Sequence, residues 1–139
     1  MTPEAVARIH DSFAAQSMMA TLGAGVRSVA AGEVQIEAPI LPGARQQQGF
    51  GHAALTFAIG DSAAGYAALT TLPLTSEVVT AEIKVNLLAP ARGEGLLAVG
   101  RVVKPGRRLV VVTAEVFALH GEDRTLIALL QGTMVPVGA

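Results

Sequence analysis

Residues 51–69, near the middle of the chain, are apolar on almost every side of the helix that they would form. The segment reads GHAALTFAIGDSAAGYAAL and carries one formal charge, Asp61. A helix that is apolar all round has to be enclosed by the rest of the fold. A carboxylate in such a setting has a large desolvation cost unless it is paired or hydrogen-bonded. Asp61 is therefore expected to be an internal cap, an ion-pair partner or a catalytic group.

The segments on both sides of this helix alternate as half-buried strands do. Apolar and polar residues alternate over 26–38, and Ala31-Gly32 is expected to turn a hairpin there. Four further strands are expected over 77–88, 95–104, 109–119 and 125–137. Short turns join these strands, so the sheet is antiparallel.

Three finer expectations concern this second half. In the strand over 77–88, Thr80 shares a polar face with Glu82. The segment Lys104-Pro105-Gly106-Arg107 fits a type II turn with Pro and then Gly at its centre. The apolar run 109–112 indicates a strand buried on both faces.

The chain begins with a typical helix start. Thr2 offers a capping hydroxyl, Pro3 suits the first helical position, and Glu4 is an acid in the first turn. Gly23 ends the helical pattern. The apolar residues that recur before it are Val6, Ile9, Phe13 and Met18.

Composition excludes several classes of protein. With 139 residues, 51% hydrophobic and 15% charged, the chain is one ordinary folded domain over 1–139 and not a disordered one. Its apolar runs are too interrupted to span a membrane, and a net charge of -1 gives no reason to expect nucleic acid as a partner. The chain has no Cys and three scattered His, so no metal site is expected. No signal peptide is visible, which favours a cytoplasmic protein.

The simplest way to enclose the apolar helix is to curve the sheet around it. The fold class expected is therefore α+β with the hotdog architecture: about six antiparallel strands wrapped around one long apolar helix, with an additional N-terminal helix.

The sequence also resembles the PaaI-like acyl-CoA thioesterases of the hotdog superfamily. Their signature is an Asn or Gln, a Gly-containing loop, His-Gly-Gly opening the helix, and an acid nine residues after the His. Here Gln46 stands six before His52, and Asp61 stands nine after it. The family's Gly-Gly is Ala53-Ala54 in this chain. Further similar segments are 80–91, Gly106-Arg107-Arg108 and Gly132-Thr133.

The resemblance implies hydrolysis of an acyl-CoA thioester, with coenzyme A as part of the substrate and no separate cofactor. Asp61 would act as general base or nucleophile, and the backbone N–H of Ala53 would bind the oxyanion. The remaining residues implied to act in catalysis are Gln46, His52 and Thr80. The residues implied to bind substrate or coenzyme A are Phe50, Gly51, Lys104, Arg107 and Arg108.

Each of these residues also has an ordinary interpretation. His52 can simply orient the helix start, and Thr80 can be a sheet threonine favoured by β-propensity. Only the family spacing selects Gln46 among three consecutive glutamines. The basic residues at 104–108 can equally be the solvated tip of a hairpin.

Helix geometry constrains where such a site can lie. Nine helical residues leave His52 and Asp61 on opposite faces, and Ala53 lies about 12 Å from Asp61 along the axis. These groups can meet only if two subunits set their helices side by side and antiparallel, as the family does. We therefore expect at least a homodimer and, beyond it, a homotetramer. The small residues expected to let the helices approach are Gly60, Ala63, Ala64 and Gly65.

The acyl pocket is expected to be apolar and lined by Phe50, Leu55, Phe57 and Tyr66. Two other functions stay open. A non-catalytic acyl-CoA-binding hotdog protein is favoured by Ala53-Ala54. A hotdog hydratase or dehydratase is less well matched, since the hydratase pattern needs His where this chain has Tyr66.

Overall fold

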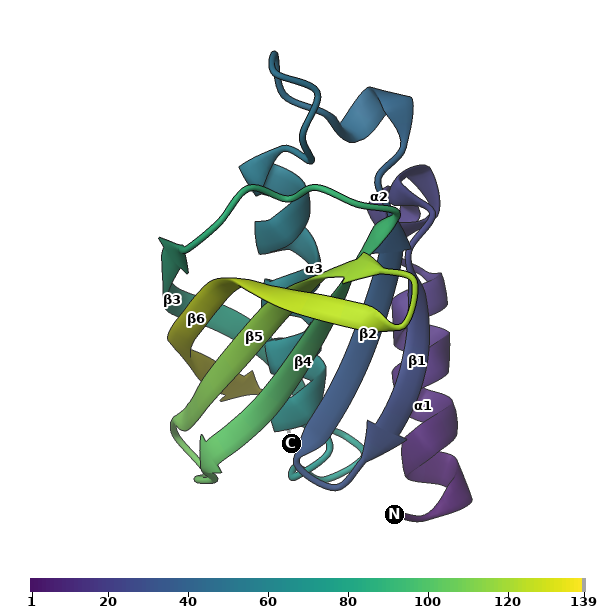
Figure 1. Cartoon of the computed structure of the whole chain (residues 1–139). Coiled ribbons are helices and arrows are strands. Elements are labelled where there is room, and N and C mark those ends of the chain that lie inside the picture. Colours follow the sequence, from purple (N-terminus) through teal and green to yellow (C-terminus); the bar gives the residue numbers. More distant parts are fainter. Residues whose placement is uncertain (139) are drawn as a thin grey trace.

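The computed structural model describes residues 1–138 and shows one antiparallel sheet curved around a central helix (Figure 1). The six strands lie in the order β1-β2-β4-β5-β6-β3. Their bounds are β1 (Gly25–Ala30), β2 (Glu33–Pro39), β3 (Glu77–Leu87), β4 (Gly95–Lys104), β5 (Val110–His120) and β6 (Asp123–Val137). The expected α+β architecture, with six strands around one long helix, is confirmed.

That helix, α3 (Ala53–Leu69), contacts five of the six strands, β2 to β6. Its sheet-facing side is built from small residues: Ala63 and Ala64 are fully buried, and a Cβ on Gly60 would lie 2.8 Å from Leu130 Cδ2. Glycine at position 100 of β4 leaves room for the α3 backbone at Ala63. The expectation that Gly60, Ala63 and Ala64 face a partner helix is therefore wrong, because they pack against the chain's own sheet.

The N-terminal region contains two helices where one helical pattern was expected. Helix α1 (Pro3–Ala14) begins as predicted, since Thr2 Oγ1 accepts a hydrogen bond from the Ala5 N–H. The chain then becomes extended at Gln16, and α2 (Ser17–Leu22) ends at Gly23 in the left-handed conformation. This break shifts the helical phase, so Met19 is buried while Met18 is 54% exposed.

The β4–β5 connection also differs from expectation. Gly106 is not among the left-handed glycines of the described chain, so the type II turn is wrong and residues 105–109 form a longer loop. Leu109 lies in that loop, where it is 55% exposed, and the strand after it alternates buried and half-buried residues. The stretch buried on both faces is residues 95–100 of β4, a central strand.

No helix within residues 1–138 is long and apolar enough to cross a membrane. A short 3₁₀ turn, η1 (Pro42–Ala44), precedes the loop that leads into α3. This loop stands at one end of the sheet, and the β4–β5 connection lies at the opposite end (Figure 1).

Candidate active site

Asp61 lies at the middle of α3, half-buried, and its carboxylate has one hydrogen-bond donor among the described residues. Thr80 Oγ1 donates to Asp61 Oδ1 at 2.7 Å. Burial raises the pKa of Asp61 above its usual range, and the Thr80 hydrogen bond lowers it in part. The ion pairs within residues 1–138 join Arg101 to Glu33 and to Glu115, so Asp61 has no basic partner there. Its ion-pair interpretation therefore loses support.

A β-bulge brings Thr80 to Asp61. Strands β3 and β6 pair Thr80 with Met134 and Glu82 with Thr133, so Ala81 is an extra residue without a partner. An inserted residue reverses the side-chain alternation. Thr80 thus points toward α3, and Glu82 faces outward to Thr133 Oγ1, which donates to it at 2.8 Å. The expectation that Thr80 and Glu82 share a face is wrong for this reason.

The start of α3 leaves one backbone N–H available. His52 caps the helix: its Nδ1 accepts from the Ala54 N–H at 2.9 Å. The N–H groups of Gly51 and His52 donate to the carbonyls of Ala91 and Ala44. Between these satisfied groups, the Ala53 N–H has no acceptor among residues 1–138. Ala53 is exposed and its N–H lies at the positive end of the helix dipole, where a negative charge is stabilised.

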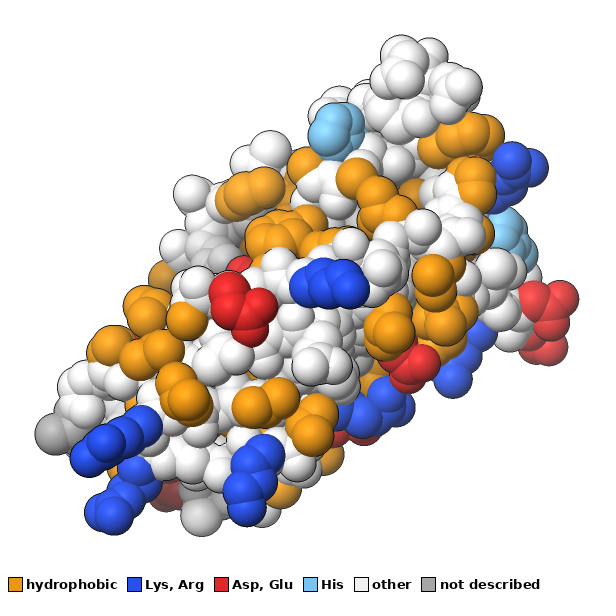
Figure 2. Space-filling view, turned by 90° about the vertical axis from the view of Figure 1, so that its left-hand side faces the viewer, with side chains coloured by type: hydrophobic (Ala, Val, Ile, Leu, Met, Phe, Trp, Pro, Cys, Tyr) orange, Lys and Arg blue, Asp and Glu red, His pale blue; other side chains and the backbone are white. Residues whose placement is uncertain are grey.

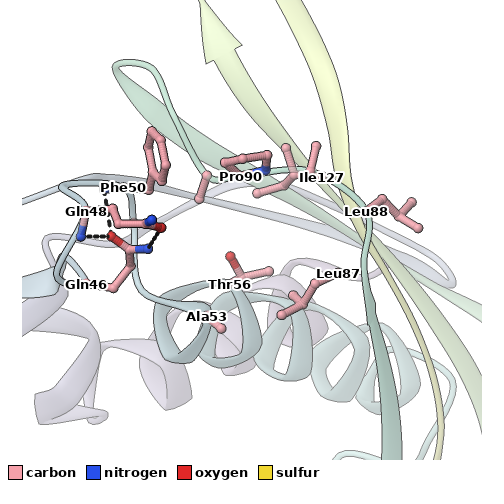
Figure 3. A pocket seen from close by; sticks show the side chains of 12 residues that line it. Gln46, Gln48, Phe50, Ala53, Thr56, Leu87, Leu88, Pro90 and Ile127 are labelled. Atoms are coloured by element: carbon pink, nitrogen blue, oxygen red, sulfur yellow. Dashed lines mark hydrogen bonds between the residues drawn. The ribbon is translucent and has the colours of Figure 1, made fainter.

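A cavity of about 400 Å³ lies over this helix start (Figure 3). Thr56 points its hydroxyl into the cavity, whose opposite wall contains Pro90 and Ile127, while Leu87 lies beside the helix. Gln46 lines it too, but Gln46 Oε1 accepts hydrogen bonds from the N–H groups of Gln48 and Phe50, at 2.5 and 3.2 Å. The remaining lining residues are Gln48, Phe50, Gly51, Ala53, Leu88, Ala89 and Ala91. Of the sequence-predicted site, this cavity unites Gln46, Phe50, Gly51 and Ala53.

A second cavity of about 180 Å³ lies beside Asp61 and Thr80. It is lined by Ser12 and Gln16, which the sequence did not single out, and by Ser62 and Tyr66 of α3. Tyr66 Oη lies 3.0 Å from Ser12 Oγ and accepts from Gln16 Nε2 at 2.8 Å. The two cavities have no lining residue in common, so one chain keeps Asp61 apart from the Ala53 N–H.

The expected acyl-pocket residues do not share one cavity. Phe50 lines the first cavity and Tyr66 the second. Leu55 is buried below a third hollow, and Phe57 is 40% exposed on the open side of α3. Within one chain, these four side chains therefore do not form a single pocket, because they leave α3 and its loop in different directions.

The expected coenzyme A-binding cations lie far from the helix start of the same chain. Lys104, Arg107 and Arg108 are exposed at the β4–β5 connection, at the opposite end of the sheet (Figure 1). Another cation, Arg92, lies near the first cavity, with Cζ 4.8 Å from the centroid of the Phe50 ring. The described residues contain no cluster of three metal-ligating side chains.

Strand β3 forms one edge of the sheet, next to the open side of α3. Figure 2 shows apolar side chains gathered on this side of the molecule between a few charged ones. The exposed apolar residues of this strand and the segment after it include Val79, Leu87 and Leu88, each more than half exposed. Asp61 thus lies beside a free strand edge.

Known proteins resemble this chain in sequence and in fold. The family model described as Thioesterase superfamily matches residues 48–125. A Thioesterase family protein from Silicibacter pomeroyi is 38% identical, with a TM-score of 0.94 over 97% of this chain and 99% of that one.

Two other solved structures share the fold, which confirms the hotdog architecture. The PaaI protein from the phenylacetic acid degradation operon of E. coli has 18% identity and a TM-score of 0.87 over 98% and 95% of the two chains. A Haemophilus influenzae thioesterase has 19% identity and a TM-score of 0.82 over 91% and 87%. Among curated proteins, none matches this sequence.

Proposed function

Because the chain belongs to the Thioesterase superfamily, we propose that it hydrolyses an acyl-CoA thioester to the free acid and coenzyme A. The observation that carries this proposal is that the chain contains both of the groups that the reaction needs. The Ala53 N–H is unengaged at a helix start, and Asp61 is a partly desolvated carboxylate held by one hydroxyl. Thioester hydrolysis requires a donor for the developing oxyanion and a base or nucleophile.

In this mechanism Asp61 removes a proton from water as the water attacks the thioester carbonyl. Alternatively, Asp61 attacks the carbonyl itself, and a water then hydrolyses the resulting anhydride to the free acid and regenerates Asp61. The Ala53 N–H donates to the oxygen that becomes negative, and the helix dipole adds to this stabilisation. Collapse of the adduct expels the thiolate of coenzyme A, which takes up a proton. A raised pKa makes the Asp61 carboxylate a stronger base than a solvated one, which favours the general-base role.

We propose that each site combines two subunits, because about 12 Å of helix rise separates the two groups in one chain. The open side of α3 carries Ala54, Phe57, Asp61 and Gly65 at helical spacing, and the free edge of β3 lies beside it. A two-fold partner with an antiparallel α3 would set its Ala53 against Asp61, and the same contact would form twice. The dimer would also cover the exposed apolar side chains near β3.

The same symmetry gives the distant cations a role. The end of β4 and the β4–β5 connection, which carry Lys104, Arg107 and Arg108, lie at the end of the molecule that holds the C-terminal end of α3 (Figure 1). An antiparallel partner would bring its Ala53 toward that end. The phosphates of coenzyme A would then meet cations of the neighbouring subunit.

Non-catalytic acyl-CoA binding is the second candidate, and the observation favouring it is Ala53-Ala54 in place of Gly-Gly. An alanine at position 53 has ordinary helical conformation and leaves its N–H free, so the replacement does not remove the donor. A hydratase is disfavoured, because Tyr66 stands where that chemistry needs His and its hydroxyl is engaged by Gln16.

The test is to inactivate each half of the site and then mix the subunits. Ala53→Pro removes the N–H and leaves the helix start intact: proline suits the first helical position, and His52 already has the extended conformation (ψ 144°) that proline requires before it. We expect kcat to fall by about 10²–10³-fold, as for loss of one oxyanion donor. Asp61→Asn should abolish turnover of a panel of acyl-CoA thioesters followed by thiol release.

Mixing the two variants after unfolding and refolding should restore about a quarter of wild-type activity, since half of the dimers are mixed and each has one intact site. Ala53→Ser, which keeps the N–H, is the matched control and should stay active. Absence of any recovery, with mixed dimers present, would refute the shared site. No turnover by the wild type across the panel, with coenzyme A still bound, would favour the non-catalytic candidate.

A further inference from the structure

We propose that the Thr56 hydroxyl is a second hydrogen-bond donor to the thioester carbonyl oxygen, beside the Ala53 N–H, and that it stabilises the negative charge that develops on this oxygen. The inference rests on the proposed function and adds a catalytic residue to it. Both donors belong to the first turns of one α3 helix, so the pair does not depend on where a second subunit lies.

Thr56 carries a buried hydroxyl that has no partner in the described chain. The residue is 1% exposed, and its Oγ1 makes no hydrogen bond to any of residues 1–138. No side-chain nitrogen or oxygen in that part of the chain is both fully buried and without a partner, so Oγ1 is the atom through which Thr56 meets the cavity (Figure 3). Removing a hydroxyl from bulk water without giving it a hydrogen bond is costly.

The usual local partner of a helical threonine is already engaged. Threonine hydroxyls inside helices commonly donate to the carbonyl four residues earlier, which is here that of His52. That carbonyl accepts from the N–H groups of Leu55 and Thr56, at 2.9 and 3.4 Å. The Thr56 hydroxyl points into the cavity instead, toward the apolar side chains of Pro90 and Ile127. It is therefore available to donate to a bound molecule.

Helix geometry places this hydroxyl beside the Ala53 N–H. Residues three apart are neighbours on one face of a helix, with about 5–6 Å between their Cβ atoms, and their side chains lean toward the N-terminus. The Thr56 side chain thus leans toward Ala53, and both residues line the same cavity. Two hydrogen bonds of about 2.9 Å each span such a separation, and a carbonyl oxygen can accept two. One thioester oxygen can therefore bind both donors.

The nearby amide of Gln46 is less available for this role. Its Oε1 accepts from the N–H groups of Gln48 and Phe50, and its Nε2 donates to Gln48 Oε1 at 3.2 Å. These hydrogen bonds hold the loop before α3 in shape. Thr56 lies on the helix itself, and helices position functional groups more precisely than loops do.

The hydroxyl acts as the charge on the carbonyl oxygen develops. When water bonds to the carbonyl carbon and Asp61 takes its proton, the π electrons of the C=O bond move to the oxygen, which the Ala53 N–H and the Thr56 O–H both contact. The electrons return as the C–S bond breaks and the thiolate leaves, and Thr56 keeps its own proton throughout. Because an anionic oxygen is a stronger acceptor than a neutral carbonyl, losing the hydroxyl should lower kcat and leave KM almost unchanged.

The first test compares variants of Thr56 in steady-state hydrolysis of the acyl-CoA panel. Thr56→Val keeps the shape and removes the hydroxyl, so kcat and kcat/KM should both fall by about tenfold or more. Thr56→Ser, the matched control, keeps the hydroxyl and should retain most of the wild-type kcat. Thr56→Ala removes the hydroxyl without adding bulk and should be as slow as Thr56→Val, which covers a valine variant that does not fold. The urea midpoint of Thr56→Val should equal or exceed that of wild type, whereas loss of a structural hydroxyl would lower it.

Infrared spectroscopy provides a second readout, which a structural role would not move. Asp61→Asn should bind a thioester without hydrolysing it, so a panel thioester that the wild type hydrolyses can be labelled with carbon-13 at its carbonyl and observed in the bound state. A hydrogen bond to the carbonyl oxygen lowers the frequency of the C=O stretch. Adding Thr56→Val to Asp61→Asn should therefore raise this frequency, and adding Thr56→Ser should not.

The outcomes separate this inference from the proposed function. If the wild type hydrolyses thioesters while folded Thr56→Val keeps its kcat, raises KM alone or leaves the C=O frequency unmoved, the second donor is wrong and the thioesterase stands. A Thr56→Ser variant as slow as Thr56→Val would also overturn the inference, because the shape of the side chain and not its hydroxyl would then matter. No turnover by the wild type on any thioester of the panel would refute the proposed function and the second donor with it.

Discussion

Replacing Thr80 with Val should move the acid limb of the pH–rate profile to higher pH. Valine keeps the shape of threonine and removes the hydroxyl that donates to Asp61 at 2.7 Å. Burial raises the pKa of Asp61, and this hydrogen bond is the opposing influence. Without the hydroxyl, the ionised form that the proposed mechanism needs is less stable relative to the protonated form.

The size of the shift follows from the strength of the lost bond. Hydrogen bonds to charged groups contribute about 1.5–3 kcal/mol, and the exposed side of Thr80 lets water replace part of that, so about 1.5 kcal/mol is reasonable. Because 1.36 kcal/mol corresponds to one pKa unit, the limb should move by about one pH unit. Below the limb the variant should be about tenfold slower than wild type, and well above it the difference should be smaller.

The assay is kcat/KM against pH, followed by direct loss of thioester absorbance so that no thiol reagent limits the pH range. Thr133→Val is the matched control, since it removes a hydroxyl that donates to Glu82 one pair along the same two strands, on the outer face. An unmoved limb in Thr80→Val would refute the reasoning. So would an equal shift in Thr133→Val, which would point to a general effect of altering these strands.

Two predictions concern stability. Asp61→Asn should raise the free energy of unfolding at neutral pH, because the folded state raises the pKa of Asp61. This gain in stability should shrink as pH falls and vanish below the usual pKa of 3.8. Urea unfolding at fixed protein concentration measures the gain, and a gain that persists at acid pH would contradict the prediction. Gly60→Ala should destabilise the fold by roughly 0.5–2 kcal/mol, since overpacking against Leu130 exceeds the gain of about 1 kcal/mol in helix propensity. A urea midpoint equal to or above that of wild type would refute the packing argument.

Local patterns predicted the fold because each expresses a physical requirement within a few residues. Residues 51–69 lack a polar face, so the helix had to be enclosed, and the structure encloses it in the sheet. The residues selected by their spacing also lie close together: the structure gathers Gln46 and Ala53 at one cavity, with His52 capping the helix. These relations need no knowledge of distant contacts.

The location of Thr80 could not be predicted in the same way. Strict alternation placed it outward with Glu82, but the bulge at Ala81 depends on how β3 pairs with β6, about fifty positions later. One unpaired residue moves the side chains of all residues before it in the strand to the opposite face of the sheet. Propensity within β3 carries no signal of that mismatch.

The cluster of Ser12, Gln16 and Tyr66 escaped notice for a related reason. Ser12 and Gln16 are four residues apart and resemble the solvated face of an N-terminal helix. Their position at the cavity beside Asp61 depends on a break in the helix at position 16 and on a contact with a side chain fifty residues away. The only local signal was Tyr66 itself, the one tyrosine in a helix composed mainly of small residues.

Asp61 links these points. Its carboxylate is desolvated, lacks a basic partner in the described chain, and has one hydroxyl donor that a bulge delivers. A group with only a structural role would be more stable as Asn, which accepts the same hydrogen bond without the charge. Retaining a destabilising charge is typical of functional sites, where stability and activity compete. Within one chain this charge faces a polar cavity and a free strand edge, and the group that it would act with lies at the other end of the same helix. The carboxylate and the Ala53 N–H are the two halves that the proposed dimer would bring together, since an antiparallel second copy of the chain carries both in matching positions.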